Sequence, residues 1–220
     1  MSHSDENLYN DAFFEKYLSR KQYIYDHRKI ANAIYKSLQP KSVIDVGCGS
    51  GQILYWLRRK NRFVPIQDRV VVRGFEKSVS ATRFWPKSVK DYIQIADCTE
   101  ILPRSNVADV VICVEVAEHI TEDSSPQLIN NLCALSQNFI VFSAAPPGQG
   151  GIGHINEQIW DFWEEKFLSN GWIEDISKTN EFRAAIDLDL VNLVLGRKRR
   201  VSPWYRSNIR ILININYGRV

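Results

Sequence analysis

The sequence predicts an α/β protein with a mostly parallel sheet that helices cover on both faces. From residue 42 onward, short apolar runs alternate with segments of helical length and helical apolar spacing. The runs themselves contain few polar residues, which is typical of strands buried on both faces of a parallel sheet. The chain has 220 residues, so we expect one such domain with short extensions.

The expected elements follow in a regular order. Aromatic and apolar residues at helical spacing predict one or two helices within residues 8–38, which Pro40 ends. The apolar runs predict five strands, at residues 42–46, 69–75, 92–96, 109–114 and 138–143. The intervening segments predict three helices, at residues 52–60, 78–85 and 124–136. A loop rich in proline and glycine then leads to the last expected elements, a helix at 156–170 and strands near 172–177 and 191–197.

Composition indicates an ordinary globular protein, with 45% hydrophobic residues, 24% charged residues and a net charge of +3. No apolar run approaches the ~20 residues that span a bilayer, and the polar first residues lack the apolar core of a secretory signal. We therefore expect a soluble, cytoplasmic protein with no membrane partner. The four cysteines form no C-x-x-C pair, and we expect free thiols rather than a zinc site.

The first expected strand ends in a glycine-rich turn, Asp45-Val46-Gly47-Cys48-Gly49-Ser50-Gly51. Glycine tolerates positive φ and lets a ligand approach the backbone, and the helix that follows offers unpaired N–H groups. This turn is compatible with several nucleotide ligands, and also with none.

Acidic residues at the ends of the next three strands narrow the range of ligands that this turn could bind. Glu76 ends the second strand, where a carboxylate can accept hydrogen bonds from both ribose hydroxyls. Asp97 and Cys98 follow the third strand, where an acceptor would meet an adenine amino group, and Glu115 ends the fourth. Three such acids are costly to bury without a donor-rich ligand. Because the connection before the second strand is long and polar, Asp68 is the alternative to Glu76.

At this point the sequence resembles a known family. V-I-D-V-G-C-G-S-G resembles the first motif of class I S-adenosylmethionine-dependent methyltransferases, and D-V-V-I-C-V-E-V-A-E-H-I resembles the fourth-strand motif of their small-molecule branch, of type 11/23. The resemblance covers about residues 40–175. It implies a Rossmann-like, doubly wound sheet of seven strands, mostly parallel with the last strand antiparallel. It also implies a set of residues that hold S-adenosylmethionine: Asp45, Gly47, Cys48, Gly49, Gly51, Glu76, Asp97, Cys98 and Glu115.

The acceptor is less defined. Amino-base methylases carry [DN]-P-P-[YFW] after the fourth strand, where this chain has E-V-A-E, and no Pro-Cys pair suggests a cysteine nucleophile. We therefore expect O-methylation of a small molecule or glycan, and N-methylation of a small amine is the second choice. The expected catalytic residues are His154, His119 and Glu118, because an imidazole titrates near neutral pH and can take a hydroxyl proton. The alternative for each histidine is a structural role, His119 bonded to the scaffold and His154 capping a helix.

The string E-x-x-E-H with a later histidine also resembles metal-dependent small-RNA 2′-O-methyltransferases and quinone O-methyltransferases. Many methyltransferases carry the same string without needing a metal. We expect no metal requirement, and the alternative is a divalent cation held by Glu115, Glu118, His119 and His154, whose mixed O/N donors suit Mn²⁺, Fe²⁺ or Zn²⁺ better than Mg²⁺.

The expected organisation has three parts. Residues 1–40 form an N-terminal helical segment that acts as a substrate lid, residues 41–198 the methyltransferase domain, and residues 199–220 a basic C-terminal tail. The aromatic residues expected to include acceptor contacts are Phe13, Phe14, Tyr17, Tyr23, Tyr25, Trp160, Phe162 and Trp163. The stretch Arg197–Arg200 with the aromatics after it could bind nucleic acid, so an RNA 2′-O-methyltransferase is an alternative function. A catalytically silent protein of this fold that serves as a binding partner is another.

Overall fold

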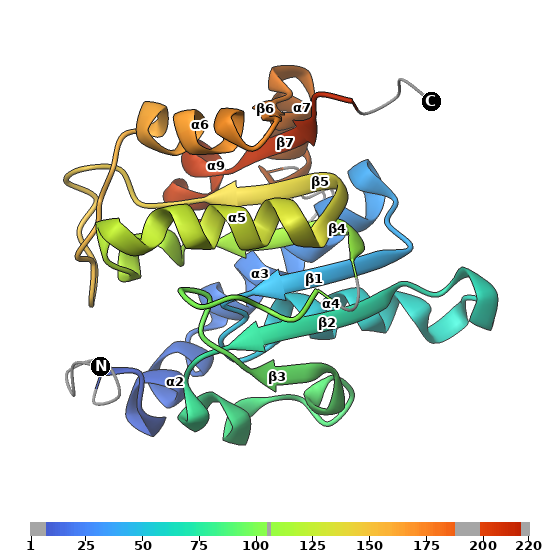
Figure 1. The fold of residues 1–220 in the computed structure, drawn as a ribbon. Helices are drawn as coiled ribbons and strands as arrows, with labels where there is room; N and C mark the ends of the chain where they lie inside the picture. Colours follow the sequence, from blue (N-terminus) through green and yellow to red (C-terminus); the bar gives the residue numbers. More distant parts are fainter. Residues whose placement is uncertain (1–7, 105–106, 188–198, 217–220) are drawn as a thin grey trace.

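The computed structural model describes residues 8–104, 107–187 and 199–216, and these form a three-layered α/β fold (Figure 1). Its centre is a seven-stranded sheet with the strand order β3-β2-β1-β4-β5-β7-β6. The strands are β1 (Ser42–Val46), β2 (Val71–Glu76), β3 (Ile93–Ile95), β4 (Ala108–Val114), β5 (Ser136–Ser143), β6 (Trp172–Glu174) and β7 (Arg210–Asn214). Pairing is parallel except that β7 runs antiparallel to β5 and β6, which confirms the predicted fold class.

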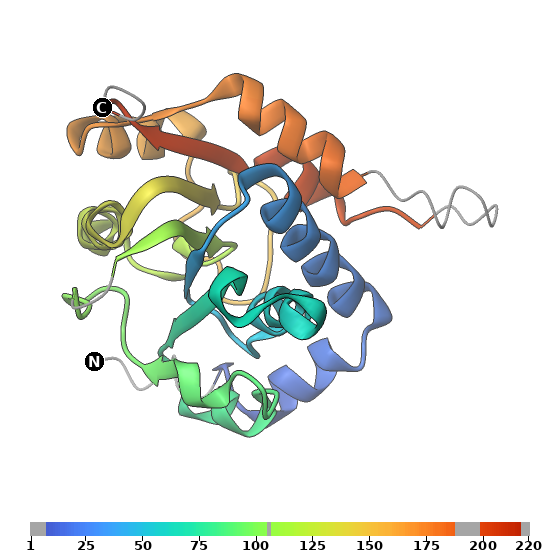
Figure 2. The ribbon, with the colours of Figure 1, turned by 90° about the vertical axis from the view of Figure 1, so that its right-hand side faces the viewer.

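Helices cover both faces of the sheet (Figure 2). One face packs against α3 (Lys21–Ala33) with its π-helical extension η1 (Ile34–Leu38), α4 (Gln52–Lys60) and α7 (Ile176–Asp187). The other face packs against α5 (Ser125–Leu135) and α6 (Trp160–Ser169). Adjacent residues of the strands face opposite layers, as Val110 and Val111 do, and both are fully buried. This is why the strands read as continuous apolar runs.

Strand order reverses between β1 and β4, since β1 has β2 on one side and β4 on the other. In an open α/β sheet, ligands bind beyond the carboxyl ends of the strands at such a reversal. The turn after β1 and the ends of β2 and β4 meet there, so the topology brings together the residues that the sequence singled out.

The C-terminal part differs from the expectation. The strand expected at 191–197 lies outside the described residues, and the last strand of the sheet is β7, within the segment expected to be a tail. Ile211 and Leu212 of β7 are fully buried, one on each face of the sheet. The short helix α9 (Pro203–Asn208) precedes β7. Residues 199–216 are therefore part of the folded domain.

Two predicted helices differ from the expectation, and a third helix was not expected. The helix expected at 156–170 begins at Trp160, and the one expected at 78–85 is the 3₁₀ segment η4 (Val79–Phe84). Helix α7 was not predicted at all. The N-terminal helices are α2 (Asp11–Leu18) and α3, as expected, and no helix among the described residues is long and apolar enough to cross a membrane.

Candidate functional site

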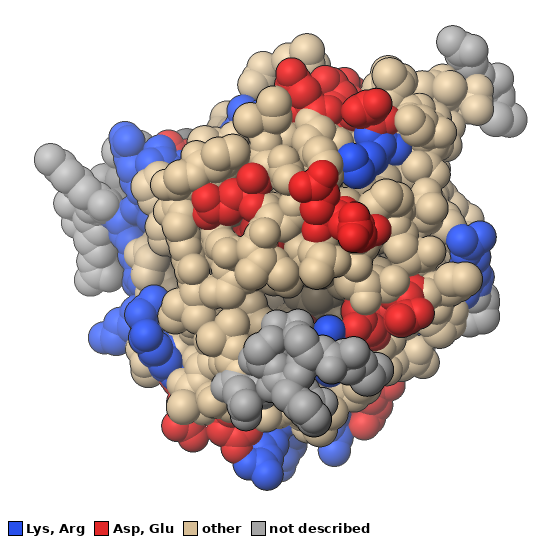
Figure 3. Space-filling view, turned by 60° about the vertical axis from the view of Figure 1, so that its left-hand side comes forward, with Lys and Arg blue, Asp and Glu red and all other residues tan. Residues whose placement is uncertain are grey.

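A cavity of about 770 Å³ lies at the carboxyl ends of β1, β2 and β4, under α2 and the loop that follows β5. The strands point toward the face shown in Figure 3, where acidic side chains lie near the middle and basic ones mostly toward the rim. Every predicted site residue except Gly51 lines this cavity: Asp45, Gly47, Cys48, Gly49, Glu76, Asp97, Cys98, Glu115, Glu118, His119 and His154. Gly51 instead begins α4 behind the cavity wall. The alternative acid Asp68 is exposed and belongs to the 3₁₀ segment η3 (Ile66–Asp68), which precedes β2.

The glycine turn needs its glycines for two reasons. Gly47, Gly49 and Gly51 have φ angles of 74°, 51° and 69°, in the left-handed region that favours glycine. At Gly47 there is also no space, because an added Cβ would lie 2.6 Å from Val116 Cγ2. The turn is held open toward the cavity by the Gly49 amide, which donates to Glu76 Oε2 at 2.7 Å.

Two carboxyl groups crowd the wall beside this turn. Asp45 is 4% exposed, and burial together with the neighbouring Glu76 raises its pKa to about 8. Burial also raises the pKa of Glu76, although the amides of Ser78 and Gly49 donate to its carboxylate. A ligand that brings positive charge or several hydrogen-bond donors would relieve this repulsion.

The end of β3 is electrostatically different. Burial alone would raise the pKa of Asp97, but the amide and hydroxyl of Thr99 and the ammonium of Lys77, 3.0 Å away, lower it. Asp97 is therefore ionised at neutral pH. Burial raises the pKa of the adjacent Cys98 to about 12, so its thiol is neutral.

Glu115, at the end of β4, is fixed in a strained conformation. Its φ of 54° is unusual for a residue other than glycine, and such strain concentrates at functional sites. Ser143 Oγ donates to Oε1 at 2.8 Å and Gln149 Nε2 donates to Oε2 at 2.9 Å. Asn208 in turn donates to Gln149, so the C-terminal segment helps to hold the carboxylate in place.

His154 forms a dyad with a residue that the sequence did not reveal. Its Nδ1 lies 2.8 Å from Glu157 Oε1, and Glu157 also accepts hydrogen bonds from the Gly148 and Gly150 amides. Because an ionised carboxylate only accepts hydrogen bonds, Nδ1 carries a proton. The other ring nitrogen, Nε2, lies 4.0 Å from Glu118 Oε1. The only sequence signal for Glu157 is its position three residues after His154.

His119 is bound to the scaffold. Its Nδ1 lies 2.8 Å from the Tyr9 hydroxyl and 3.1 Å from the Gly153 carbonyl oxygen. Its ring packs edge-on against His154, with 4.9 Å between the ring centroids. These contacts favour the structural alternative for His119.

Glu118 is fully buried beneath the two histidines, and no hydrogen bond of good geometry reaches either carboxylate oxygen. Burial, and then the charge of Glu115, raises its pKa well above the usual range. The potential ligand atoms of Glu118, His119 and His154 all lie within 4.8 Å of one another. Glu115 is not in this group, so the structure brings together three of the four residues of the metal alternative.

Aromatic side chains from α2 and α3 line the outer half of the cavity. Phe13, Tyr17 and Tyr23 form a continuous row, with ring centroids 4.5 Å and 5.7 Å apart. Trp204 and Tyr205 of α9 complete the wall and were not expected there. Other expected acceptor contacts are core residues instead: Tyr25 and Trp163 are buried away from the cavity, and Trp160 packs on Phe142 and Phe167.

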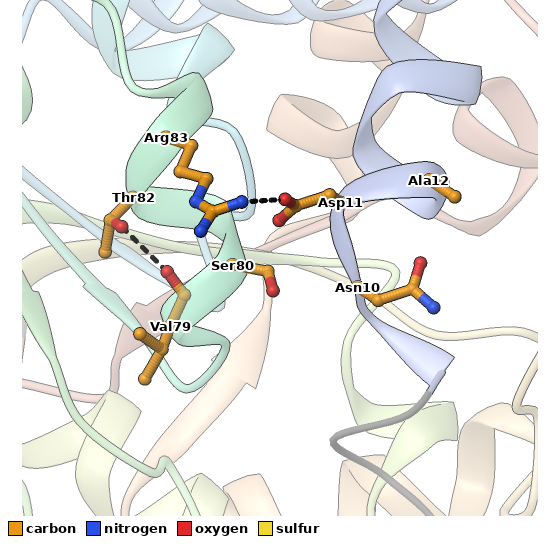
Figure 4. A pocket seen from close by; sticks show the side chains of 7 residues that line it. All are labelled: Asn10, Asp11, Ala12, Val79, Ser80, Thr82 and Arg83. Carbon is orange, nitrogen blue, oxygen red and sulfur yellow. Dashed lines mark hydrogen bonds and ion pairs between the residues drawn. The ribbon is translucent and has the colours of Figure 1, made fainter.

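Helix α2 is held over the cavity by polar contacts. Arg83 of η4 pairs with Asp11 beside a shallow outer pocket of about 450 Å³ (Figure 4). On the cavity side, Ser78 Oγ donates to the Tyr9 carbonyl at 2.8 Å. Helix α2 therefore forms part of the cavity wall, and its action as a substrate lid stays a prediction.

The basic residues expected to bind nucleic acid are largely occupied within the chain. Arg199 donates to Gln22 and lies over the Tyr25 ring, Arg206 lies 3.8 Å from Asp187, and Arg210 pairs with Glu174 at 3.3 Å. Arg197 and Lys198 lie outside the described residues.

Comparison with known proteins agrees with this geometry. The family model described as "Methyltransferase domain" (Methyltransf_23) matches residues 17–172. The structure is similar to that of the magnesium protoporphyrin IX methyltransferase of Synechocystis PCC 6803 with bound SAH, with a TM-score of 0.62 and 15% identity over 95% of this chain and 97% of that one. It is also similar to an O-methyltransferase of a trans-AT PKS multienzyme of Brevibacillus brevis, in complex with S-adenosyl-L-homocysteine. Here the TM-score is 0.57 and the identity 13%, over 97% of this chain and 80% of that one. A third similar structure is the sugar N-methyltransferase KedS8 of a Streptoalloteichus species, with a TM-score of 0.60 and 11% identity over 92% of each chain. No curated protein matches the chain by sequence.

The sheet order, the glycine turn after β1 and the acids at the ends of β2, β3 and β4 are those of a class I S-adenosylmethionine-dependent methyltransferase. The chain belongs to the methyltransferase domain family whose model covers most of its length.

Proposed function

We propose that this protein transfers a methyl group from S-adenosylmethionine to a hydroxyl group of a small molecule or glycan, with His154 as the proton acceptor. The observation that carries this proposal is the Glu157–His154 dyad in the wall of the cavity, in which the carboxylate holds Nδ1 and Nε2 is the nitrogen that would take a proton. Among the similar structures are an O-methyltransferase and a sugar N-methyltransferase, which is compatible with a small acceptor.

The residues present fit the cofactor. Asp45 and the glycines Gly47 and Gly49 would hold its methionine end, Glu76 its ribose, and Asp97 with Cys98 its adenine edge. Asp45, whose pKa is raised to about 8 beside Glu76, suits a ligand that carries an ammonium and a sulfonium group. Bound there, the cofactor supplies an electrophilic methyl carbon.

The chain's own residues then align the acceptor and move its proton. Nε2 of His154 takes the proton of the acceptor hydroxyl, and Glu157 stabilises the imidazolium that forms. Helix α2 and the aromatic row of Phe13, Tyr17 and Tyr23 exclude water and hold the acceptor, which amounts to catalysis by orientation.

Methylation of a small amine is the second candidate, and Glu118 favours it. A buried carboxyl whose pKa is raised well above its usual value would ionise beside an ammonium group and so bind it. A hydroxyl acceptor needs no such charge.

Titration calorimetry with S-adenosylmethionine tests the proposal first. We expect saturable binding by the wild type, with release of protons at pH 7 because Asp45 ionises beside the cationic ligand, and loss of binding in Asp45→Ala. Equal binding by the variant would overturn the assignment of the cavity. A mass-shift screen with hydroxylated and amino metabolites then separates the two acceptors, and methylation of amines alone would refute the hydroxyl assignment.

A further inference from the structure

Residues 62–69 form a loop that projects from the amino end of β2, and we call it the projecting loop. Arg62 and the seven residues that follow are exposed except Val64, which is half-buried. The neck of the loop is fixed by two reciprocal hydrogen bonds: Asn61 Nδ2 donates to the Val70 carbonyl at 2.8 Å, and the Val70 amide donates to Asn61 Oδ1 at 2.9 Å. Asn61 and Val70 are both buried, so the loop stands out from a firm base.

Two large apolar side chains lie on this loop and face water. Phe63, in the 3₁₀ segment η2 (Asn61–Phe63), is 90% exposed, and Ile66, at the start of η3, is 79% exposed. They are the two most exposed large hydrophobic side chains of the described residues. Exposed apolar side chains held together on a fixed support indicate a contact surface rather than scattered surface residues.

The surroundings of these two side chains are strongly basic. Residues 58–69 contain five Lys or Arg residues and one acid, Asp68. The Arg62 guanidinium lies 5.4 Å from the centre of the Phe63 ring. Burial lowers the pKa of Lys60, at the end of α4, and the nearby charges of Lys36 and Arg28 lower it further, so basic residues of α3 and η1 lie close to the base of the loop.

The projecting loop lies far from the cavity. Helix α4 begins at the glycine turn and leads away from it, and the loop follows the other end of this helix (Figure 1). The strands point toward the opposite side of the molecule, where the cavity opens. The proposed methyl transfer therefore leaves these side chains unexplained, and a partner bound at the loop would leave the cavity accessible.

We propose that the projecting loop docks the protein on an anionic phospholipid surface, with Phe63 and Ile66 inserted at the boundary of the acyl chains and the surrounding basic residues against the headgroups. Apolar insertion and basic attraction are each weak alone, and peripheral membrane proteins combine them. A nucleic acid would use an aromatic face and positive charge but gains nothing from Ile66. The expectation of no membrane partner rested on the absence of a long apolar run, and it does not bear on binding of this kind.

Co-sedimentation of the full chain with phosphatidylcholine vesicles, with and without phosphatidylglycerol, tests this proposal. We expect sedimentation only with phosphatidylglycerol, weakened by salt. Phe63→Ser with Ile66→Ser should weaken binding at least tenfold, Arg62→Gln about fivefold, and Asp68→Asn should strengthen it severalfold. Ile101→Ser is the matched control, because Ile101 is 73% exposed but lies outside the loop, and it should bind as the wild type does.

Three results would overturn the proposal: no sedimentation with anionic vesicles, equal sedimentation with phosphatidylcholine alone, or full binding by the double variant. Retention on poly(U) without vesicle binding would also overturn it and would assign the loop to nucleic acid. If the double variant does not fold, as judged by circular dichroism, the opposite effects of Arg62→Gln and Asp68→Asn decide the question.

Discussion

His154 and Glu157 are the residues on which the proposed chemistry depends, because the carboxylate fixes which ring nitrogen carries the proton. We expect His154→Ala to lower kcat by roughly 10²–10⁴-fold, the usual contribution of a general base. Glu157→Gln should lower kcat at least tenfold, since an amide can donate to Nδ1 and favour the wrong tautomer. Steady-state kinetics on an acceptor from the metabolite screen provides the measurement.

The control for this pair is Glu122→Gln, which changes an exposed carboxylate on a neighbouring loop and should leave kcat unchanged. Calorimetry should show unaltered cofactor binding in all three variants. The pH profile of kcat/KM adds a readout that a purely structural role would not move, because the limb due to the base should disappear in His154→Ala. A retained limb would contradict the assignment.

At the scale of residues, the sequence predicted the cavity residues that lie at strand ends most directly. Asp45, Glu76, Asp97 and Glu115 were predicted because a parallel sheet brings its carboxyl ends to one edge, and all four line the cavity. Glu157 was missed because its contact with His154 depends on the path of a glycine-rich loop. Tyr205 reaches the same cavity from almost the other end of the chain, and no local pattern could show that.

At the scale of elements, one carboxylate ties helix α3 to the C-terminal segment. Asp26 is 2% exposed and accepts hydrogen bonds from the Ser202 amide, the Ser202 hydroxyl and Gln22 Nε2. We expect Asp26→Ala to reduce the free energy of unfolding by about 2–3 kcal/mol, because buried donors lose their partner. Urea denaturation measures this change.

The matched variant is Asp11→Ala, which removes the exposed ion pair between α2 and Arg83. Since exposed pairs contribute little, its free energy of unfolding should change by less than about 1 kcal/mol. An equal decrease in the free energy of unfolding of the two variants would show that the burial of Asp26 does not account for its contribution to stability.

The elements found from sequence are those with a strong local signal. β1, β4 and β5 are apolar runs of five to eight residues, and each lies within two residues of its predicted position. β7 was missed because Arg210–Asn214 contains only three consecutive apolar residues and follows polar and basic residues. It becomes a strand by pairing with β5 and β6, and the local sequence of β7 does not indicate this long-range pairing. Helix α7 has few apolar residues and is fixed by burying Phe182 and Ile186 against the sheet.

At the scale of the whole molecule, the buried carboxyl groups of the cavity lower the stability of the fold, and the rest of the protein compensates for this cost. Burial raises the pKa of Asp45, Glu76 and Glu118, all three in the wall of the same cavity. Functional sites commonly carry such a cost in stability, which a ligand then relieves. The cost should therefore be measurable in the protein without ligand.

Asp45→Asn is expected to make the ligand-free protein more stable, and by clearly more at pH 8.5 than at pH 5. The pKa of Asp45 is about 8 in the folded protein against an ordinary value of 3.8, so the folded state holds the proton more tightly. Its stabilising contribution is complete below about pH 3.8 and is lost progressively as the pH rises from there to about 8, whereas asparagine loses nothing. Asp97→Asn should have the opposite sign: its pKa is lowered, so the charged form stabilises the fold at neutral pH and the variant should be less stable there. Urea denaturation of the three proteins at both pH values tests this difference, and a gain for Asp45→Asn that did not grow with pH would contradict it.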